Sequence, residues 1–143
     1  MPAADPVLEL LRDVELFEGV PAKKLKAVRS LGKEVWFAPG QTITKEGEKG
    51  GRFFLILSGQ ARLYIGNRTR SSAVLGRGDT VGEMSLLDGE PRMATVLATT
   101  EVETWSLVPW HFRGLLREEP AIMEHLIKVL CRRLRTAQRP SAD

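Results

Sequence analysis

The 143 residues predict an α+β fold: an antiparallel β-roll of about eight short strands, jelly-roll-like, flanked by N-terminal helices and two C-terminal hinge helices. Three observations support this prediction. Apolar residues recur at helical spacing near both ends of the chain. Short runs rich in β-branched and aromatic residues fill the middle, and glycines fall between most of these runs, where tight turns need them.

The chain is predicted to form one domain with three parts. In residues 1–33, Asp5 and Pro6 are typical of an N-cap and a first helical residue, and Pro21 opens a second helix. Residues 34–108 form the roll, with strands expected at EVWF, TITK, FFLIL, ARLYI, SAVL, ATVLA and VETWSLV. In residues 109–138, Pro109 and Pro120 each start a helix.

The last helix carries two apolar rows. The first row alternates spacings of four and three residues, which is typical of a helix that pairs with a partner; its members are Met123, Ile127, Leu130, Leu134 and Ala137. The second row lies beside it: Ile122, Leu126 and Val129. Two interpretations stay open, because the rows either form a homodimer interface through 120–138 or all pack on their own domain.

Composition is that of an ordinary globular protein, with 43% hydrophobic and 27% charged residues. No apolar run reaches the length of a membrane span, and the N-terminus lacks the pattern of a secretory signal. The single cysteine, Cys131, cannot form an internal disulfide; we expect it on the last helix, packed in the core of the domain. These features predict a cytoplasmic protein without a membrane span.

One stretch, GEMSLLDGEPRMAT at 82–95, has the residue types and spacing of a phosphate site. Gly82 permits a sharp turn, after which a short helix from Glu83 would present free backbone amides near Met84 and Ser85 to an anion. Arg92 returns to the same helix end with a fork of donors suited to phosphate oxygens.

Glu83 needs a partner that donates a hydrogen bond, and a sugar hydroxyl is the natural one, so phosphate and ribose together indicate a nucleotide. Each residue alone also has an ordinary interpretation. A glutamate in a first helical turn is favourable through the helix dipole, and an arginine after a proline is commonly a solvated surface charge.

The spacing GE-x-S-LL-x-G-x-PR-x-AT resembles the phosphate-binding cassette of the cyclic nucleotide-binding domain family. The resemblance continues through PGQTI at 39–43, EG at 46–47, FFLILSGQARL at 53–63 and LGRGD at 75–79. It implies that Glu83 holds the ribose 2′-hydroxyl and that Arg92 pairs with the cyclic phosphate. Cassette residues complete the site, and these are Gly82, Met84, Ser85, Met93 and Ala94.

The resemblance also implies a switch. Ligand draws the cassette inward, so that Leu86 or Leu87 moves away from Phe112 on the first hinge helix, and the last helix closes over the purine. The spacing from Arg92 through Pro120 resembles that of bacterial cyclic nucleotide-gated potassium channels, which places Arg133 against the base. Alternatively, Arg133 belongs to a solvated basic tail; the other base-contact candidates are Thr136, Ala137, Tyr64, Ile65, Ala73 and Val74.

Met93 favours cAMP over cGMP as the ligand. In eukaryotic members of the family a Thr or Ser at this position can hydrogen-bond guanine, and Met93 has no such donor. A second departure from the family pattern is the pair Gly50 and Gly51, where an acidic residue is common.

A ligand-sensing module that regulates a partner protein is therefore the predicted function. A DNA-binding regulator of the catabolite activator type shares the domain, and the pI of 9.3 would help approach to DNA. Only five residues follow Gln138, too few for a helix-turn-helix, so direct DNA binding is not expected. An enzyme is not expected, because His111 and His125 have no metal-ligand spacing and no nucleophile motif is present. The remaining alternatives are a non-binding scaffold or dimerisation domain that keeps the fold, or a fragment of a cyclic nucleotide-regulated channel or transcription factor.

Overall fold

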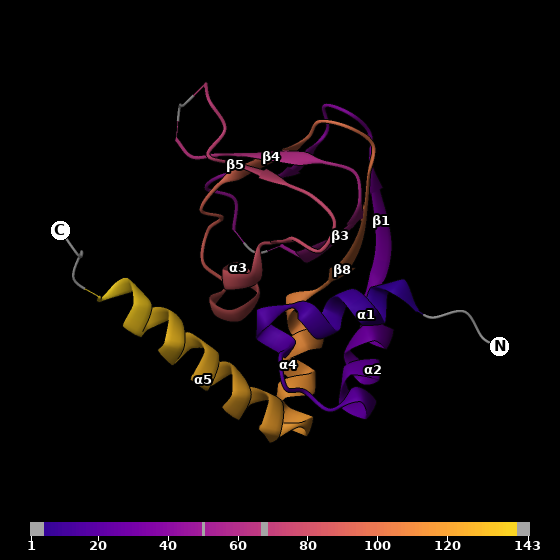
Figure 1. The fold of residues 1–143 in the computed structure, drawn as a ribbon, viewed down its shortest axis with the longest axis vertical. Helices are drawn as coiled ribbons and strands as arrows, with labels where there is room; N and C mark the ends of the chain where they lie inside the picture. The colour runs from indigo at the N-terminus through magenta and orange to yellow at the C-terminus, as the bar shows by residue number, and fades with distance from the viewer. Residues whose placement is uncertain (1–4, 50, 67–68, 140–143) are drawn as a thin grey trace.

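The computed structural model describes residues 5–49, 51–66 and 69–139 (Figure 1). Helices precede and follow the strands: α1 (Pro6–Asp13), the 3-10 helix η1 (Glu15–Phe17), α2 (Ala22–Leu31), α4 (Pro109–Glu118) and α5 (Pro120–Ala137). The strands are β1 (Lys33–Phe37), β2 (Thr42–Thr44), β3 (Phe53–Ser58), β4 (Ala61–Tyr64), β5 (Ala73–Leu75), β6 (Thr80–Val81), β7 (Thr95–Ala98) and β8 (Val102–Leu107). A short helix, α3 (Glu83–Asp88), lies between β6 and β7.

Within the described residues the strands form two four-stranded sheets, with the orders β1-β8-β3-β6 and β2-β7-β4-β5. Neighbouring strands are antiparallel throughout. In Figure 1 the helices α1, α2 and α4 gather at one end of the strands, and α5 leads away from α4. The predicted α+β fold, an antiparallel roll flanked by helices, is confirmed.

Strand β3 separates two hydrophobic cores, because its side chains alternate between the two faces of the sheet. Phe53, Leu55 and Leu57 belong to the core that the helices cover. Phe54 and Ile56 belong to the core inside the roll. A strand that is buried on both faces is a near-continuous apolar run, which is why FFLIL has no polar alternation.

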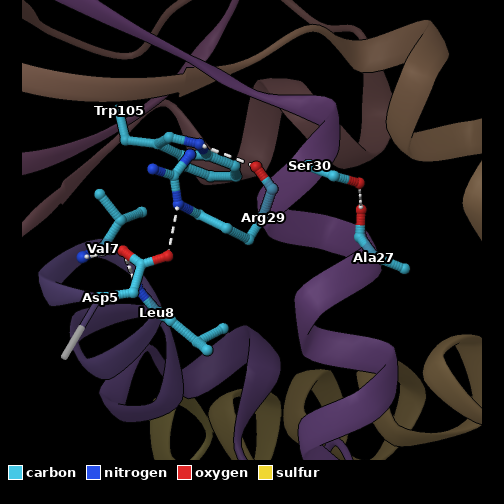
Figure 2. A network of polar contacts seen from close by, with 7 residues as sticks. All are labelled: Asp5, Val7, Leu8, Ala27, Arg29, Ser30 and Trp105. Carbon is cyan, nitrogen blue, oxygen red and sulfur yellow. Dashed lines mark hydrogen bonds and ion pairs between the residues drawn. The ribbon is translucent and has the colours of Figure 1, made fainter. Parts of the chain in front are cut away.

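A polar network fixes the N-terminal helices to the sheet (Figure 2). Asp5 caps α1 by accepting from the backbone N–H groups of Val7 at 3.0 Å and Leu8 at 3.4 Å. Its second carboxylate oxygen accepts from Nε of Arg29 on α2 at 3.2 Å. The Arg29 carbonyl in turn accepts from the buried indole N–H of Trp105 on β8 at 3.3 Å. The predicted N-cap therefore also links α1 to α2.

The two apolar rows of α5 have different environments. Ile122, Leu126 and Val129 are buried in the helix-covered core. The other row is exposed to solvent, with exposed fractions of 43% for Met123, 57% for Ile127, 41% for Leu130 and 58% for Leu134. The interpretation in which all eight residues pack on their own domain is therefore wrong for this row.

Two further observations concern the chain as a whole. Cys131 is exposed on α5, so its expected place in the core is wrong; the helix turns its Ile122, Leu126 and Val129 side inward instead. No helix in the described part of the chain is both long enough and apolar enough to cross a membrane.

Candidate functional site

The stretch 82–95 folds as a turn, a short helix and a return segment. Gly82 follows β6 with a φ of 81°, and Gly89 ends α3 with a φ of 70°. Both angles lie in the left-handed region that residues with a Cβ avoid. The buried hydroxyl of Ser85 donates to the carbonyl of Glu90 at 3.1 Å, so it closes the loop on itself. The short helix predicted from Glu83 is present.

Arg92 enters the interior directly after this turn. Its backbone N–H donates to the Glu48 carbonyl at 2.8 Å, and its carbonyl accepts from Gly47 at 3.0 Å, which holds the segment against the loop after β2. Only 7% of Arg92 is exposed. Nη2 donates to the carbonyl of Arg52 at 2.5 Å, whereas the buried Nη1 has no hydrogen-bond partner among the described residues.

Two glycines make room for this guanidinium group. A Cβ on Gly82 would overlap Nη1 of Arg92, and a Cβ on Gly51 would overlap Nη2. Gly51 has a φ of 107°, which also disfavours any residue with a side chain. The departure from the family pattern at Gly51 therefore has a physical reason, since the turn and the arginine both need a glycine. Gly50 lies outside the described residues.

Burial lowers the pKa of Arg92, and the nearby negative charge of Glu48 opposes this shift. An arginine starts so far above neutral pH that the group stays a cation. A buried cation with an unused donor is costly unless an anion pairs with it. The site thus has the charge and the free donor that a phosphate oxygen requires.

Glu83 lines the same pocket as Arg92 and makes two side-chain contacts. Its Oε2 lies 3.4 Å from Oγ1 of Thr80, and its Oε1 lies 2.8 Å from Nη1 of Arg133 on α5. Arg133 also donates from Nε to Oε1 of Glu15 at 2.7 Å. Burial lowers the pKa of Arg133, but its hydrogen bonds to Glu15 and Glu83 outweigh this effect, so that its pKa is raised overall.

A pocket of about 190 Å³ opens between the cassette and the roll. Its lining includes seven predicted site residues: Gly82, Glu83, Met84, Ser85, Arg92, Met93 and Ala94. Five further residues line it that the sequence did not single out for binding: Thr44, Leu63, Thr80, Val81 and Val96. Most of the additional residues are apolar, which suits the flat face of a base.

The other predicted base contacts are not part of this lining. Arg133 reaches the pocket wall through Glu83 rather than lining the pocket itself. Thr136 and Ala137 line a separate hollow with Glu15 and Arg133. The four candidates on the roll are also outside the pocket lining: Tyr64, Ile65, Ala73 and Val74.

Strand register explains why the sequence alone did not indicate the pocket-lining residues of the roll. Val96 on β7 is the register partner of Leu63 on β4 and of Thr44 on β2. Three segments that are distant in sequence therefore meet at one point of the pocket wall. Only the pairing of the strands carries this information, since each residue alone has the pattern of an ordinary strand position.

The three predicted switch residues share one core. Leu86 and Phe112 are both fully buried there, and Leu87 packs against it. The ring of Phe112 meets Phe17 of η1 edge-on at a centroid distance of 6.0 Å, and Phe17 meets Phe53 of β3 at 6.3 Å. The cassette, the first hinge helix and the N-terminal segment are thus in contact through a single packed cluster.

Comparison with known proteins agrees with this geometry. The family model described as "Cyclic nucleotide-binding domain" matches residues 34–119. The "CRP-like cAMP-activated global transcriptional regulator" of Mycobacterium tuberculosis is 33% identical over 140 residues, covering 94% of this chain and 62% of the relative. A "cAMP-dependent protein kinase regulatory subunit" of Colletotrichum orbiculare is 37% identical over 116 residues, covering 80% of this chain and 29% of the relative.

A solved structure agrees as well. The N-terminal domain of a transcriptional regulator from Streptomyces coelicolor superimposes with a TM-score of 0.84 at 31% identity, covering 94% of this chain and 98% of that one. The chain spans about three fifths of the Mycobacterium regulator's length, 62%. The match of sequence, fold and cassette leads to one conclusion: this chain belongs to the cyclic nucleotide-binding domain family.

Proposed function

We propose that this chain is a cyclic nucleotide-sensing module that prefers cAMP and moves its C-terminal helices, 109–138, to regulate a partner protein. The observation that carries the proposal is Arg92, a residue of the pocket lining whose buried Nη1 has no hydrogen-bond partner among the described residues. A cyclic phosphate would supply both the missing acceptor and the missing negative charge. The chain would act as a binding module rather than as an enzyme.

Three groups would hold the ligand. Arg92 would pair with the cyclic phosphate, and the backbone amides of cassette residues such as Met84 and Ser85 would complete the anion site. Glu83 would accept from the ribose 2′-hydroxyl, because an ionised carboxylate only accepts hydrogen bonds. Arg133 is not among these groups, because it pairs with Glu15 and Glu83 and is not part of the pocket lining; a direct contact between Arg133 and the purine is the alternative.

The preference for cAMP rests on the pocket chemistry around the base. Met93, which follows Arg92 directly, is 67% exposed and offers a thioether and no hydroxyl donor. Leu63, Val81 and Val96 add further apolar surface. The two relatives described above are named for cAMP, which supports the same choice. cGMP is the alternative ligand.

Movement of the C-terminal helices would begin at α3. Leu86 of α3 and Phe112 of α4 lie in the same core, so a shift of the cassette changes the packing available to α4. Cores are close-packed, and such contacts exchange between discrete arrangements rather than stretching. Nucleotide would then select the arrangement that it binds better.

Calorimetric titration of nucleotide-stripped protein with cAMP and with cGMP tests the proposal. We expect binding of both with a preference for cAMP, and we expect Arg92→Ala to weaken binding by about 1.5 to 3 kcal/mol, roughly tenfold or more. Arg92→Lys, which keeps the charge but loses the fork of donors, should lie between the two. Circular dichroism confirms that each variant is folded. If the wild type gives no heat with either nucleotide, the chain is a scaffold that keeps the fold.

We also propose that α5 pairs with a second copy of the chain through 120–138. The exposed row Met123, Ile127, Leu130 and Leu134 supports this, since four large apolar side chains along one helix face are left uncovered while the adjacent row is buried.

The regulated partner is a separate question. The named relatives include a transcriptional regulator and a kinase regulatory subunit, and this chain spans only part of each. We propose an effector protein as the partner.

A further inference from the structure

Arg133 joins three elements of the fold through two carboxylates. Its Nε binds Glu15 of η1 at 2.7 Å, and its Nη1 binds Glu83 of α3 at 2.8 Å, while Arg133 itself belongs to α5. The exposed fractions of these side chains are 32% for Arg133, 47% for Glu15 and 25% for Glu83. The three charges are therefore partly shielded from water. An ion pair in such a partly buried place is stronger than one on an open surface.

The position of the pocket shows from which side Arg133 reaches Glu83. Glu83 lines the pocket, but neither Arg133 nor Glu15 does. Arg133 and Glu15 instead line the separate hollow beside α5. Arg133 therefore contacts Glu83 from outside the pocket and leaves the pocket open.

The ion pair leaves Glu83 able to accept more hydrogen bonds. An ionised carboxylate has about four acceptor positions. Arg133 uses one on Oε1, and the Thr80 hydroxyl lies 3.4 Å from Oε2. The remaining positions are available to a donor that enters from the pocket.

A carboxylate beside an anion site needs such support. Without a countercharge, Glu83 would repel the phosphate that Arg92 attracts and would be free to change its rotamer. Arg133 offsets that charge and fixes the carboxylate before a ligand arrives, which lowers the entropy cost of binding. Glu15 holds the other edge of the guanidinium group and so fixes the direction from which Nη1 approaches.

We propose that Arg133 and Glu15 are positioning residues for Glu83, which they hold ready to accept a ribose hydroxyl. The inference rests on the proposed function, because it specifies how the nucleotide site is prepared. Since Arg133 belongs to α5, a ligand held on Glu83 also strengthens the attachment of the C-terminal half of α5 to η1, as the reciprocity of linked equilibria requires.

The chain contains a matched control pair that joins α5 to the end of η1. Arg132 of α5 lies 3.7 Å from Glu18, directly after η1, and these side chains are 56% and 59% exposed. This pair has the same charges and nearly the same sequence positions but makes no contact with Glu83. Its removal should leave nucleotide binding unchanged.

The test measures cAMP affinity of the full chain by calorimetry for Arg133→Gln, Glu15→Gln, the control Glu18→Gln, and Arg133→Gln in a Glu83→Gln background. We expect affinity to fall about tenfold in Arg133→Gln and about threefold in Glu15→Gln, and to stay at the wild-type value in Glu18→Gln. In the Glu83→Gln background, Arg133→Gln should cause no further loss, because it acts through Glu83.

A nucleotide-independent signal accompanies these titrations. The Nε–H resonance of Arg133 in nitrogen-edited NMR spectra of ligand-free protein should be protected in the wild type and in Glu18→Gln, and should lose protection in Glu15→Gln. Wild-type affinity in both Arg133→Gln and Glu15→Gln would overturn the positioning role. So would an undiminished Arg133→Gln effect in the Glu83→Gln background, which would mean that Arg133 contacts the ligand itself. A wild-type protein that binds neither cAMP nor cGMP refutes the proposed function instead.

Discussion

Replacement of Gly82 by alanine tests how the fold places Arg92. The φ of 81° at Gly82 is unfavourable for alanine by roughly 1 to 2 kcal/mol. The new Cβ would also overlap Nη1 of Arg92 and lie 3.0 Å from the carbonyl of Arg52. Because the backbone on that side cannot yield cheaply, we expect the guanidinium group to move.

Movement of the guanidinium group has its own cost. It breaks the bond from Nη2 to the Arg52 carbonyl, and a hydrogen bond from a charged donor contributes about 1.5 to 3 kcal/mol. Together with the backbone strain, this loss should lower the free energy of unfolding by about 2.5 to 5 kcal/mol. Nucleotide affinity should fall about as far as in Arg92→Ala, since the arginine is displaced from the pocket.

The assay combines urea unfolding with calorimetric titration of cAMP. Gly114→Ala is the matched control: it adds the same methyl group within α4, at a helical position where no atom from outside the adjoining turns of the helix backbone lies within 4 Å of the new Cβ. It should stabilise the protein by up to about 1 kcal/mol and leave affinity unchanged. A Gly82→Ala protein with wild-type stability and affinity would show that the glycine does not hold Arg92 in place.

Two further predictions concern the helices. If α5 pairs with a second copy, Leu130→Asp should convert a dimer to a monomer in analytical ultracentrifugation while the protein stays folded. Leu126, by contrast, is only 3% exposed, so Leu126→Asp should unfold the protein. An unchanged sedimenting mass of Leu130→Asp would reject the interface. Asp5→Ala should lower the unfolding free energy by about 1 to 2 kcal/mol, because both the α1 cap and the bond to Arg29 are lost. Asp5→Asn keeps a capping side chain and should recover most of this loss. Equal losses of stability in thermal melts of the two variants would contradict the capping role of Asp5.

The sequence predicted the ends of helices well, because these depend on interactions between residues that are close in the chain. Asp5 with Pro6, and the prolines at 109 and 120, mark helix starts because cap and φ preferences act within one turn. Gly82 and Gly89 mark the two ends of α3 for the same reason. The cassette residues of the candidate site lie within fourteen consecutive positions, so one contiguous motif was enough to indicate them.

Interactions between distant segments were not predictable in this way. Glu15 and Arg133 are separated by 118 positions and meet only because α5 packs along η1. Leu63 and Val96 face the pocket because of strand register, which the alternation of apolar residues does not determine. The expected burial of Cys131 was wrong for a similar reason. The sequence of a helix with two apolar rows does not show which row its own domain will bury.

The core cluster gives the N-terminal segment a part in any switching. Phe112 of α4 contacts Phe17 of η1, and Phe17 contacts Phe53 of the roll, while Leu86 of the cassette belongs to the same cluster. Close-packed side chains cannot follow a shift of α3 unless their neighbours also change place. Glu15 and Phe17 lie on the same short helix, so η1 is connected to the cassette twice, through the ion pair with Arg133 and through the aromatic core. A ligand that moves α3 must therefore act on η1 as well as on α4, and the output of the domain should be sought at the N-terminal helices as well as at the C-terminal ones.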